Sequence, residues 1–221
     1  MIVFLENVLS AAHVDAFVKA LDDVELFESG TRTAGSTAKS QKQNLQALNA
    51  RPEVAGMLKQ IREDLTRHSV FNSFALPARL GRLTISRYET GMQYGTHFDD
   101  AFIDGVRTDL SVTLFLSDPD TYSGGELELT TPSGSQAIKL PSGCAIVYPS
   151  DHLHAVLPVT DGVRLAAVGW VQSRIRSSSD RQLLFELHEA TQQLEAGGVQ
   201  NAEALLKLKY VRNNLIRKWS D

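Results

Sequence analysis

The chain has 221 residues, of which 43% are hydrophobic and 22% are charged. This is ordinary globular usage, and it excludes a chain that is disordered or collagen-like throughout. A chain of this length buries about 70% of its unfolded surface, which is enough for a core without disulfides. Lys and Arg number 22 against 26 Asp and Glu, giving a formal charge of −4. This balance disfavours non-specific binding to nucleic-acid phosphates.

A single cysteine, Cys144, excludes an intrachain disulfide and any cysteine-rich metal site. Its apolar neighbours favour a buried, small hydrophobic side chain. No apolar run approaches the roughly 20 residues that a membrane helix needs. The opening MIVFLENVLS lacks the basic region and the cleavage site of a signal peptide. We therefore expect a cytoplasmic protein without a membrane partner.

Residues 1–78 are predicted to form an N-terminal helical cover. Ser10 is a typical helix N-cap, and apolar residues follow it at helical spacing. A second helix is expected to begin near Pro52, with an apolar stripe that continues to Leu65. The intervening residues 28–43 are rich in Gly, Ser, Thr and Lys, which is typical of a loop.

Residues 79–175 have a different pattern, with short strand-like runs separated by Gly, Pro, Asp and Ser. Such runs at nearly regular spacing indicate a β-sandwich or barrel. Residues 176–221 are again helical in pattern, and Gly197 and Gly198 mark the break between two helices. The expected fold is therefore mainly β with flanking helices, with a C-terminal helical extension.

His97 and Asp99 are the first candidate metal ligands. In an extended chain their side chains would point to the same face. His154 follows much later and supplies a third ligand, and two His with one carboxylate form the facial triad of non-haem Fe(II) oxygenases. His152 is a rival third ligand, because it would share the face of His154 in a regular strand. An isolated His-x-Asp is a weak signal.

Arg164 strengthens this interpretation. It follows His154 by ten residues with the turn sequence TDG between them, so the two residues fit neighbouring strands of a hairpin. A guanidinium there could hold a dicarboxylate by a bidentate pair. Tyr88 could add a phenolic hydrogen bond to the same carboxylate. Trp170 shares the strand face of Arg164.

Tyr88 ends the strand-like run RLTISRY. Thr84 and Ser86 share its face, while Leu83 and Ile85 take the other face. A polar lumen with an apolar outer face is what a barrel around a hydrated metal site would show.

Together, these residues resemble those of a known family. HFD at positions 97–99, His154, Arg164, Tyr88 and Trp170 resemble the 2-oxoglutarate- and Fe(II)-dependent dioxygenases of the prolyl 4-hydroxylase type. The resemblance is greater to the bacterial PKHD-type hydroxylases, through RTAGSTAKSQKQN, FLSDPDTYSGGELEL and LHAVLPVTDGVRLAAVGWVQS. It covers essentially the whole chain. Asp100 departs from the family, where Asn is common at this position.

The resemblance implies a fold and an activity. The fold would be a double-stranded β-helix, or jelly roll, with helices packed on it. Fe(II) would be bound by His97, Asp99 and His154. Arg164 and Tyr88 would bind 2-oxoglutarate, with Trp170 placed among the cofactor-binding residues. The enzyme would use O₂, with ascorbate as reductant, to hydroxylate an unactivated C–H and release succinate and CO₂. Its substrate, a protein residue or a small molecule, is unassigned, and some family members are associated with iron uptake.

Three further parts of the sequence lead to hypotheses about substrate access and self-association. Glu126 lies either on a solvated sheet face or at the substrate entrance. Residues 32–44 are expected to close over substrate, because lids often come from such Gly- and Ser-rich segments. The apolar stripes of the C-terminal helices are expected either to pack internally or to form a homo-oligomer.

Two other functions compete with a hydroxylase. A sensor that binds metal or 2-oxoglutarate without turnover would share the metal ligands, but a protein that binds only metal would not need the dicarboxylate anchor Arg164. A nucleic-acid demethylase would use the same chemistry, but the chain lacks a basic stripe interleaved with aromatic residues. The sequence therefore favours the hydroxylase.

Overall fold

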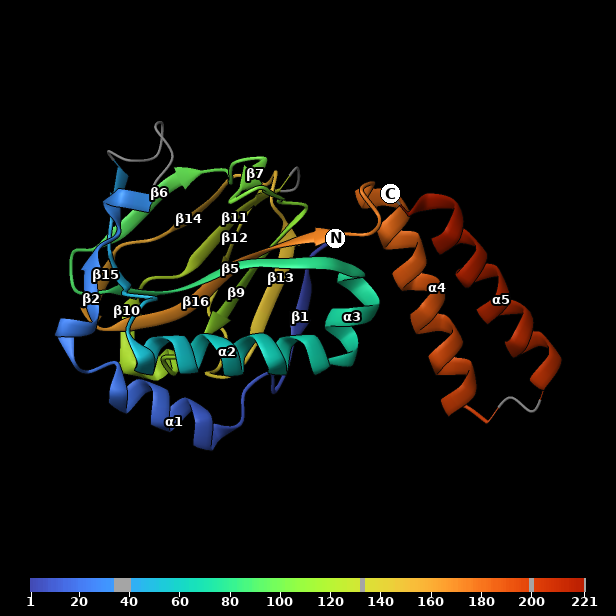
Figure 1. Cartoon of the computed structure of the whole chain (residues 1–221), viewed down its shortest axis with the longest axis horizontal. Coiled ribbons are helices and arrows are strands. Elements are labelled where there is room, and N and C mark those ends of the chain that lie inside the picture. The colour runs from blue at the N-terminus through green and yellow to red at the C-terminus, as the bar shows by residue number, and fades with distance from the viewer. Residues whose placement is uncertain (34–40, 132–133, 199–200, 221) are drawn as a thin grey trace.

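The structure, a computed structural model, describes residues 1–33, 41–131, 134–198 and 201–220. Two antiparallel sheets form the centre of the fold, helices cover one side, and a helical hairpin projects at one end (Figure 1). The order of the strands differs from their order in the chain in both sheets, so segments far apart in sequence become neighbours.

The larger sheet has seven strands in the order β1-β13-β9-β16-β5-β4-β2. In that order the strands are Val3–Leu5, Ala145–Pro149, Leu110–Phe115, Arg164–Ser173, Pro77–Tyr88, Leu45–Ala47 and Phe27–Ser29. The long strands β5 and β16 pair along most of their length, from Tyr88 opposite Arg164 to Pro77 opposite Ser173. Tyr88 and Arg164 lie opposite each other at one end of this pairing.

The smaller sheet has five strands in the order β12-β11-β14-β6-β3. In that order they are Gly134–Ile138, Leu127–Thr131, His154–Val156, Gln93–His97 and Lys42–Gln43. Two further strand pairs lie at the edges: β10 (Tyr122–Gly124) with β15 (Val159–Gly162), and β7 (Phe102–Ile103) with β8 (Val106–Arg107).

Five α-helices are described: α1 (Ala11–Ala20), α2 (Pro52–Arg67), α3 (Ser69–Ala75), α4 (Ser178–Ala196) and α5 (Ala202–Trp219). Short 3₁₀ turns occupy Val24–Leu26, Gly30–Thr33 and Pro119–Thr121. Ser10 caps α1 by accepting the His13 N–H, and Pro52 begins α2, as the sequence predicts. Helices α1 and α2 lie along the outer side of the larger sheet (Figure 1).

The main core lies between the larger sheet and helices α1–α3. On β5, Leu83 and Ile85 face this core, whereas Thr84, Ser86 and Tyr88 line a cavity between the sheets. The predicted division into an apolar outer face and a polar inner face is therefore confirmed. A second apolar cluster joins the two sheets at one end, and it consists of Phe115, Leu127, Leu129, Ile138, Ile146 and Tyr148.

The first 78 residues differ from a purely helical cover. They also supply β1, β2 and β4 to the larger sheet and β3 to the smaller one. These strands are two or three residues long, which is too short for hydrophobic periodicity to identify. Part of the segment predicted to act as a lid, residues 34–40, lies outside the described residues.

The C-terminal helices form an antiparallel hairpin attached at α3. The rings of Phe74 on α3 and Phe185 on α4 meet edge to face, with their centroids 5.4 Å apart. Helix α4 ends where the sequence predicts, because Gly197 is its C-cap and Gly198 has a positive φ of 74°. Among the described residues, no helix is long and apolar enough to cross a membrane.

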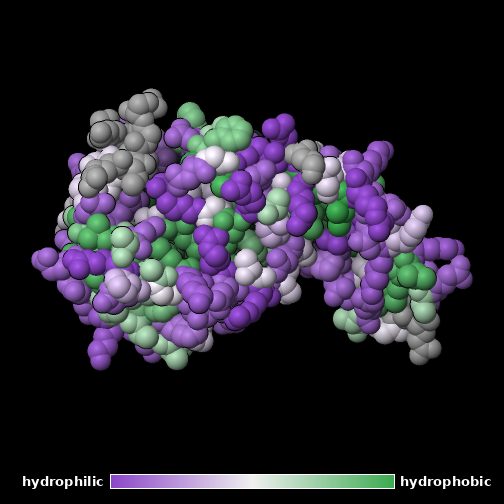
Figure 2. All heavy atoms as spheres, viewed as in Figure 1, coloured by the Kyte–Doolittle hydropathy of each residue, from purple (hydrophilic) through white to green (hydrophobic). Residues whose placement is uncertain are grey.

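Figure 2 shows hydrophobic residues among hydrophilic ones over this hairpin. The predicted stripe on α4 is only partly buried, because Leu184 is buried while Leu183 and Leu194 are exposed. On α5, the exposed large apolar side chains are Leu206, Tyr210 and Val211. Internal packing therefore covers only part of the apolar surface of the extension.

Candidate active site

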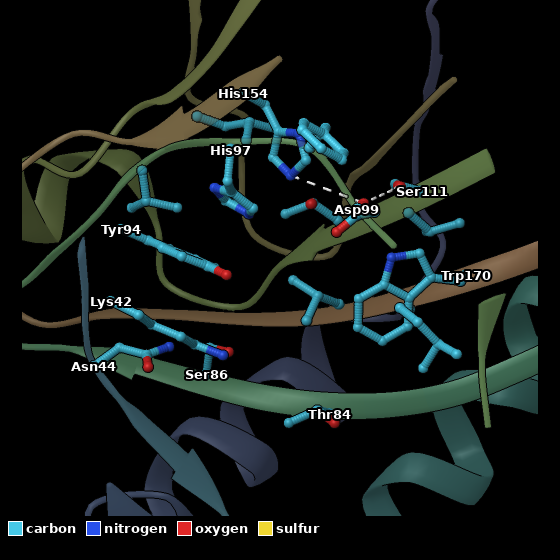
Figure 3. Close-up of a pocket in the computed structure, with 18 of the residues that line it drawn as sticks. Lys42, Asn44, Thr84, Ser86, Tyr94, His97, Asp99, Ser111, His154 and Trp170 are labelled. Atoms are coloured by element: carbon cyan, nitrogen blue, oxygen red, sulfur yellow. Dashed lines mark hydrogen bonds and ion pairs between the residues drawn. The ribbon is translucent and has the colours of Figure 1, made fainter. Parts of the chain in front are cut away.

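His97, Asp99 and His154 come together at the edge of the cavity between the sheets. His97 ends β6 and His154 begins β14, and the two residues are direct partners across the antiparallel pairing. Asp99 lies just beyond β6, and Phe98 between the two ligands points outward with 60% of its surface exposed. The ligand atoms of the three side chains all lie within 4.8 Å of one another. Among the described residues, this is the cluster suited to a metal ion (Figure 3).

Hydrogen bonds fix the orientation of both imidazole rings. His97 Nδ1 lies 2.8 Å from the Gly95 carbonyl oxygen, and His154 Nδ1 lies 2.9 Å from that of His152. Since a carbonyl only accepts, each Nδ1 carries the proton and donates it. Each Nε2 therefore has a free lone pair, and an outer partner on Nδ1 is the usual arrangement for a metal-binding His. His154 Nε2 lies 3.8 Å from Asp99 Oδ2.

Burial keeps His97 neutral. Loss of solvation, together with the adjacent His154, lowers the pKa of His97 from 6.5 to about 4. Tyr94 stacks on the His97 ring with a centroid separation of 3.6 Å. A neutral imidazole near pH 7 is the form that binds a metal ion.

His152, the rival third ligand, lies outside this cluster. Its Nδ1 pairs with Asp151 at 3.0 Å, and its backbone carbonyl supports His154. The structure therefore brings His154 to the cluster with His97 and Asp99, and it gives His152 a supporting position.

Arg164 is the most deeply buried cation of the cavity. Its side chain has 1% of its surface exposed, and the guanidinium packs against the rings of Tyr88 and Phe115, at 5.2 and 5.5 Å from their centroids. No described carboxylate lies within ion-pair distance of it. Its Nε and Nη2 are buried without a hydrogen-bond partner among the described residues. Such an arrangement is costly unless a ligand supplies acceptors.

Tyr88 lies beside this guanidinium, and the side chain of Asn44 lies beside Tyr88. Burial raises the pKa of Tyr88, and Arg164 and the side chain of Asn44 oppose this shift only in part. The phenol therefore keeps its proton and can donate it. Asn44 is also buried, with 4% of its surface exposed, and its side chain interacts with Tyr88. Donors without acceptors are what the far carboxylate of a 2-oxoglutarate molecule would need.

Trp170 lies at the other end of the cavity. It is on the same face of β16 as Arg164, but six residues further along, which is about 20 Å at roughly 3.3 Å per residue. Trp170 lies opposite Ser111 of β9, on the far side of Asp99 from Tyr94 (Figure 3). Trp170 therefore lies far along β16 from Arg164.

Glu126 does not line the cavity. The next residue, Leu127, does line it, and alternation along the chain directs Glu126 away. The solvated sheet face is therefore the alternative that the structure favours, and the predicted substrate contact of Glu126 has no support from its position.

Three cavity residues received no functional role from the sequence. Lys42, Asn44 and Gln46 alternate along β3 and β4, and all three are buried and face the cavity. Burial, aided by Arg82, lowers the pKa of Lys42 to about 8. The alternation of three polar residues was a signal in the sequence. However, the strands around them are too short to be predicted.

The cavity has a volume of about 490 Å³ and is lined by residues of both sheets. It is therefore large enough for a small dicarboxylate together with part of a second molecule.

Comparisons with known proteins agree with this geometry. Residues 83–172 match the family described as the 2OG-Fe(II) oxygenase superfamily. Residues 179–221 match the PKHD-type hydroxylase C-terminal domain. A PKHD-type hydroxylase of Maricaulis maris is 42% identical over the full length of both chains. One from Parvibaculum lavamentivorans is 40% identical, also over the full length of both.

The chain belongs to the PKHD-type hydroxylase family. The family resemblance found in the sequence is therefore confirmed. PKHD-type hydroxylases fall within the 2-oxoglutarate- and Fe(II)-dependent oxygenases, so membership implies Fe(II), 2-oxoglutarate and O₂.

Solved structures show the same fold at low identity. A prolyl-4-hydroxylase from Pseudomonas putida has a TM-score of 0.56 and 21% identity, covering 78% of this chain and 92% of its own. A prolyl hydroxylase from Trichoplax adhaerens, in complex with a hypoxia inducible factor peptide fragment, has a TM-score of 0.62 and 18% identity. The match covers 82% of this chain and 86% of that one. The predicted jelly-roll core with a helical extension is thus confirmed for this PKHD-type hydroxylase.

Proposed function

We propose that this PKHD-type hydroxylase inserts one atom of O₂ into an unactivated C–H bond of its substrate. The other oxygen atom enters 2-oxoglutarate, which is converted to succinate and CO₂. One observation carries this proposal: a His-Asp-His cluster and a buried arginine that has no ion-pair partner among the described residues line the same cavity. A metal-binding protein without a dicarboxylate ligand would have no use for that arginine.

In this proposal His97, Asp99 and His154 hold the metal through two Nε2 atoms and one carboxylate. These three side chains would supply the two-His, one-carboxylate donor set that is typical of non-haem Fe(II) oxygenases. Bound Fe(II) supplies the activation of O₂. The protein holds the ligands rigidly, since both rings are fixed by backbone carbonyls and His97 is also stacked on Tyr94.

Arg164 binds the 5-carboxylate of 2-oxoglutarate, and Tyr88 and Asn44 donate further hydrogen bonds. The guanidinium forms charge-assisted bonds that gain strength from burial, because the local dielectric constant is lower inside the protein than in water. The rings of Tyr88 and Phe115 hold the guanidinium plane in place. The end of the cavity near Trp170 then receives the substrate.

The substrate class stays open between a protein residue and a small molecule. The lining of the cavity includes Asp100 and Asp104, which are exposed acidic residues. They disfavour a phosphate backbone as substrate, so we propose that nucleic acid is not a partner.

A cytoplasmic location, ascorbate as reductant, a link to iron uptake, and closure of residues 32–44 over the substrate remain predictions. The domain division at residues 78/79 and 175/176 also remains a prediction.

The proposal is tested by succinate release from 2-oxoglutarate in the presence of Fe(II), ascorbate and O₂, without added substrate. We expect slow succinate production by the wild type and none by His154→Ala, with His152→Ala retaining activity as the matched histidine control. Equal rates for the wild type and His154→Ala would contradict the assignment. Absence of turnover in a wild type that binds both Fe(II) and 2-oxoglutarate would favour the sensor alternative.

A further inference from the structure

Asp99, the carboxylate of the metal cluster, is the end of a chain of hydrogen bonds. Ser111 Oγ lies 2.5 Å from Asp99 Oδ2, and Ser150 Oγ lies 2.8 Å from Ser111 Oγ (Figure 3 shows the first of these). The Asp99 N–H also donates to the Ser150 carbonyl at 3.3 Å. Asp99 is thus tied to Ser150 through its backbone and, by way of Ser111, through its side chain.

The chemistry of the three groups determines which of them donates in each of these hydrogen bonds. A carboxylate only accepts hydrogen bonds, so Ser111 must donate its single hydroxyl proton to Asp99. Ser111 then has only lone pairs left for Ser150, so Ser150 is the donor in the second bond. Both hydroxyls are buried, with 3% and 2% of the residue surface exposed. A buried hydroxyl without a partner is costly, so each serine depends on the next.

The two serines lie on rigid parts of the fold. Ser111 is in β9, between Tyr148 of β13 and Trp170 of β16 in the strand pairing. Ser150 directly follows β13, and its N–H donates to the Asp109 carbonyl at 3.3 Å. Ser111, in the larger sheet, therefore binds the carboxylate of Asp99, although the two histidines of the cluster belong to the smaller sheet.

We propose that Ser111, supported by Ser150, is a positioning residue that sets the orientation of Asp99 for metal binding. The bond to Oδ2 fixes the carboxylate plane, and no described residue donates to Oδ1. Without Ser111, Asp99 would rotate freely and would have to be ordered when the metal binds. This inference rests on the proposed metal centre, and it adds a residue that acts on the metal site through Asp99.

The test is Mn(II) affinity, measured by the loss of the free-ion signal in electron paramagnetic resonance, without turnover. Removal of such a supporting bond typically weakens metal binding about 10–100-fold. We expect this loss in Ser111→Ala and a smaller loss in Ser150→Ala. Ser111→Thr keeps the hydroxyl and should remain within about threefold of the wild type. Thr84→Val, which removes another buried hydroxyl of the cavity, is the matched control and should also bind normally.

Thermal unfolding of the metal-free variants separates positioning from folding. Positioning predicts weakened Mn(II) binding with a melting temperature close to that of the wild type. Wild-type affinity in Ser111→Ala would overturn the inference, and so would an equal loss in Thr84→Val. If Ser111→Ala does not fold, the Mn(II) affinities of Ser150→Ala and Ser111→Cys are measured instead. Wild-type Mn(II) affinity in both of these variants would overturn the inference. A wild type that binds no Mn(II) would instead contradict the proposed metal centre.

Discussion

His97 and His154 are direct partners across β6 and β14, and their ring centroids are 4.2 Å apart. Two ligands far apart in the sequence thus become neighbours through a single strand pairing. Sheets hold side chains more precisely than loops do, so the two imidazoles are in place before a metal arrives. Asp99 is less constrained, because it lies beyond the end of its strand and relies on Ser111 and Ser150.

Replacement of Arg164 by Met is expected to weaken 2-oxoglutarate binding selectively. Truncation of one partner of a buried charge pair costs about 2–5 kcal/mol, which corresponds to at least a roughly 30-fold rise in the dissociation constant. Titration of the Mn(II)-loaded protein with 2-oxoglutarate measures this, and Mn(II) affinity itself should not change. Arg79→Met, which removes an exposed arginine of β5, is the control.

The same substitution should stabilise the protein in the absence of ligand. Arg164 is buried without an ion-pair partner among the described residues, and replacing buried charge by apolar volume is often stabilising by about 1–4 kcal/mol. We expect Arg164→Met to unfold at a higher temperature than the wild type when 2-oxoglutarate is absent. A lower unfolding temperature for Arg164→Met would indicate that the guanidinium already has hydrogen-bond acceptors in the ligand-free protein.

The stability of the metal-free protein should depend on His97. Its pKa is about 4 in the folded state and about 6.5 when unfolded, so the unfolded chain binds more protons between these values. The free energy of unfolding should therefore be highest above pH 6.5 and should fall as the pH decreases toward 4. Urea unfolding at pH 7, 6 and 5 measures this. His97→Asn should flatten the dependence, and an unchanged slope in that variant would contradict it.

Trp170→Leu should leave cosubstrate binding nearly unchanged. Because Trp170 lies far along β16 from Arg164, we expect the affinities for Mn(II) and 2-oxoglutarate to stay within about threefold of the wild type. The same titrations provide the measurement. A tenfold or larger loss of 2-oxoglutarate affinity would instead support the sequence-based placement of Trp170 among the cofactor-binding residues.

The exposed apolar residues of the C-terminal hairpin predict self-association. Leu206, Tyr210 and Val211 lie exposed on α5, and burial of such side chains would favour a dimer. Light scattering after gel filtration should give about twice the mass of the 24.3 kDa chain. Leu206→Glu combined with Tyr210→Glu should return it to one chain. A wild-type mass near that of one chain would contradict this prediction.

Much of the site could be predicted from local sequence patterns. Alternation along RLTISRY correctly separates Leu83 and Ile85, in the core, from the cavity face of Tyr88. The short spacing of HFD correctly places His97 and Asp99 together. These inferences need only the period of an extended chain.

Other features depend on long-range pairing that no local pattern specifies. Lys42 and Asn44 reach the cavity because strands of two or three residues join two different sheets. Ser111 supports Asp99 because the sheets face each other across the cavity. Trp170 and Arg164 share one face of β16. However, they lie six residues apart along this strand, so they are at opposite ends of the cavity.

In the proposed enzyme, one cavity holds Fe(II) at His97, Asp99 and His154 and 2-oxoglutarate at Arg164. The most direct measurement is the visible absorption spectrum after anaerobic addition of Fe(II) and 2-oxoglutarate, since a weak charge-transfer band requires both on one site. We predict this band in the wild type, its absence in His154→Ala, and its appearance in Arg164→Met only at much higher 2-oxoglutarate. No band in the wild type at saturation, or an unchanged band in His154→Ala, would contradict the account.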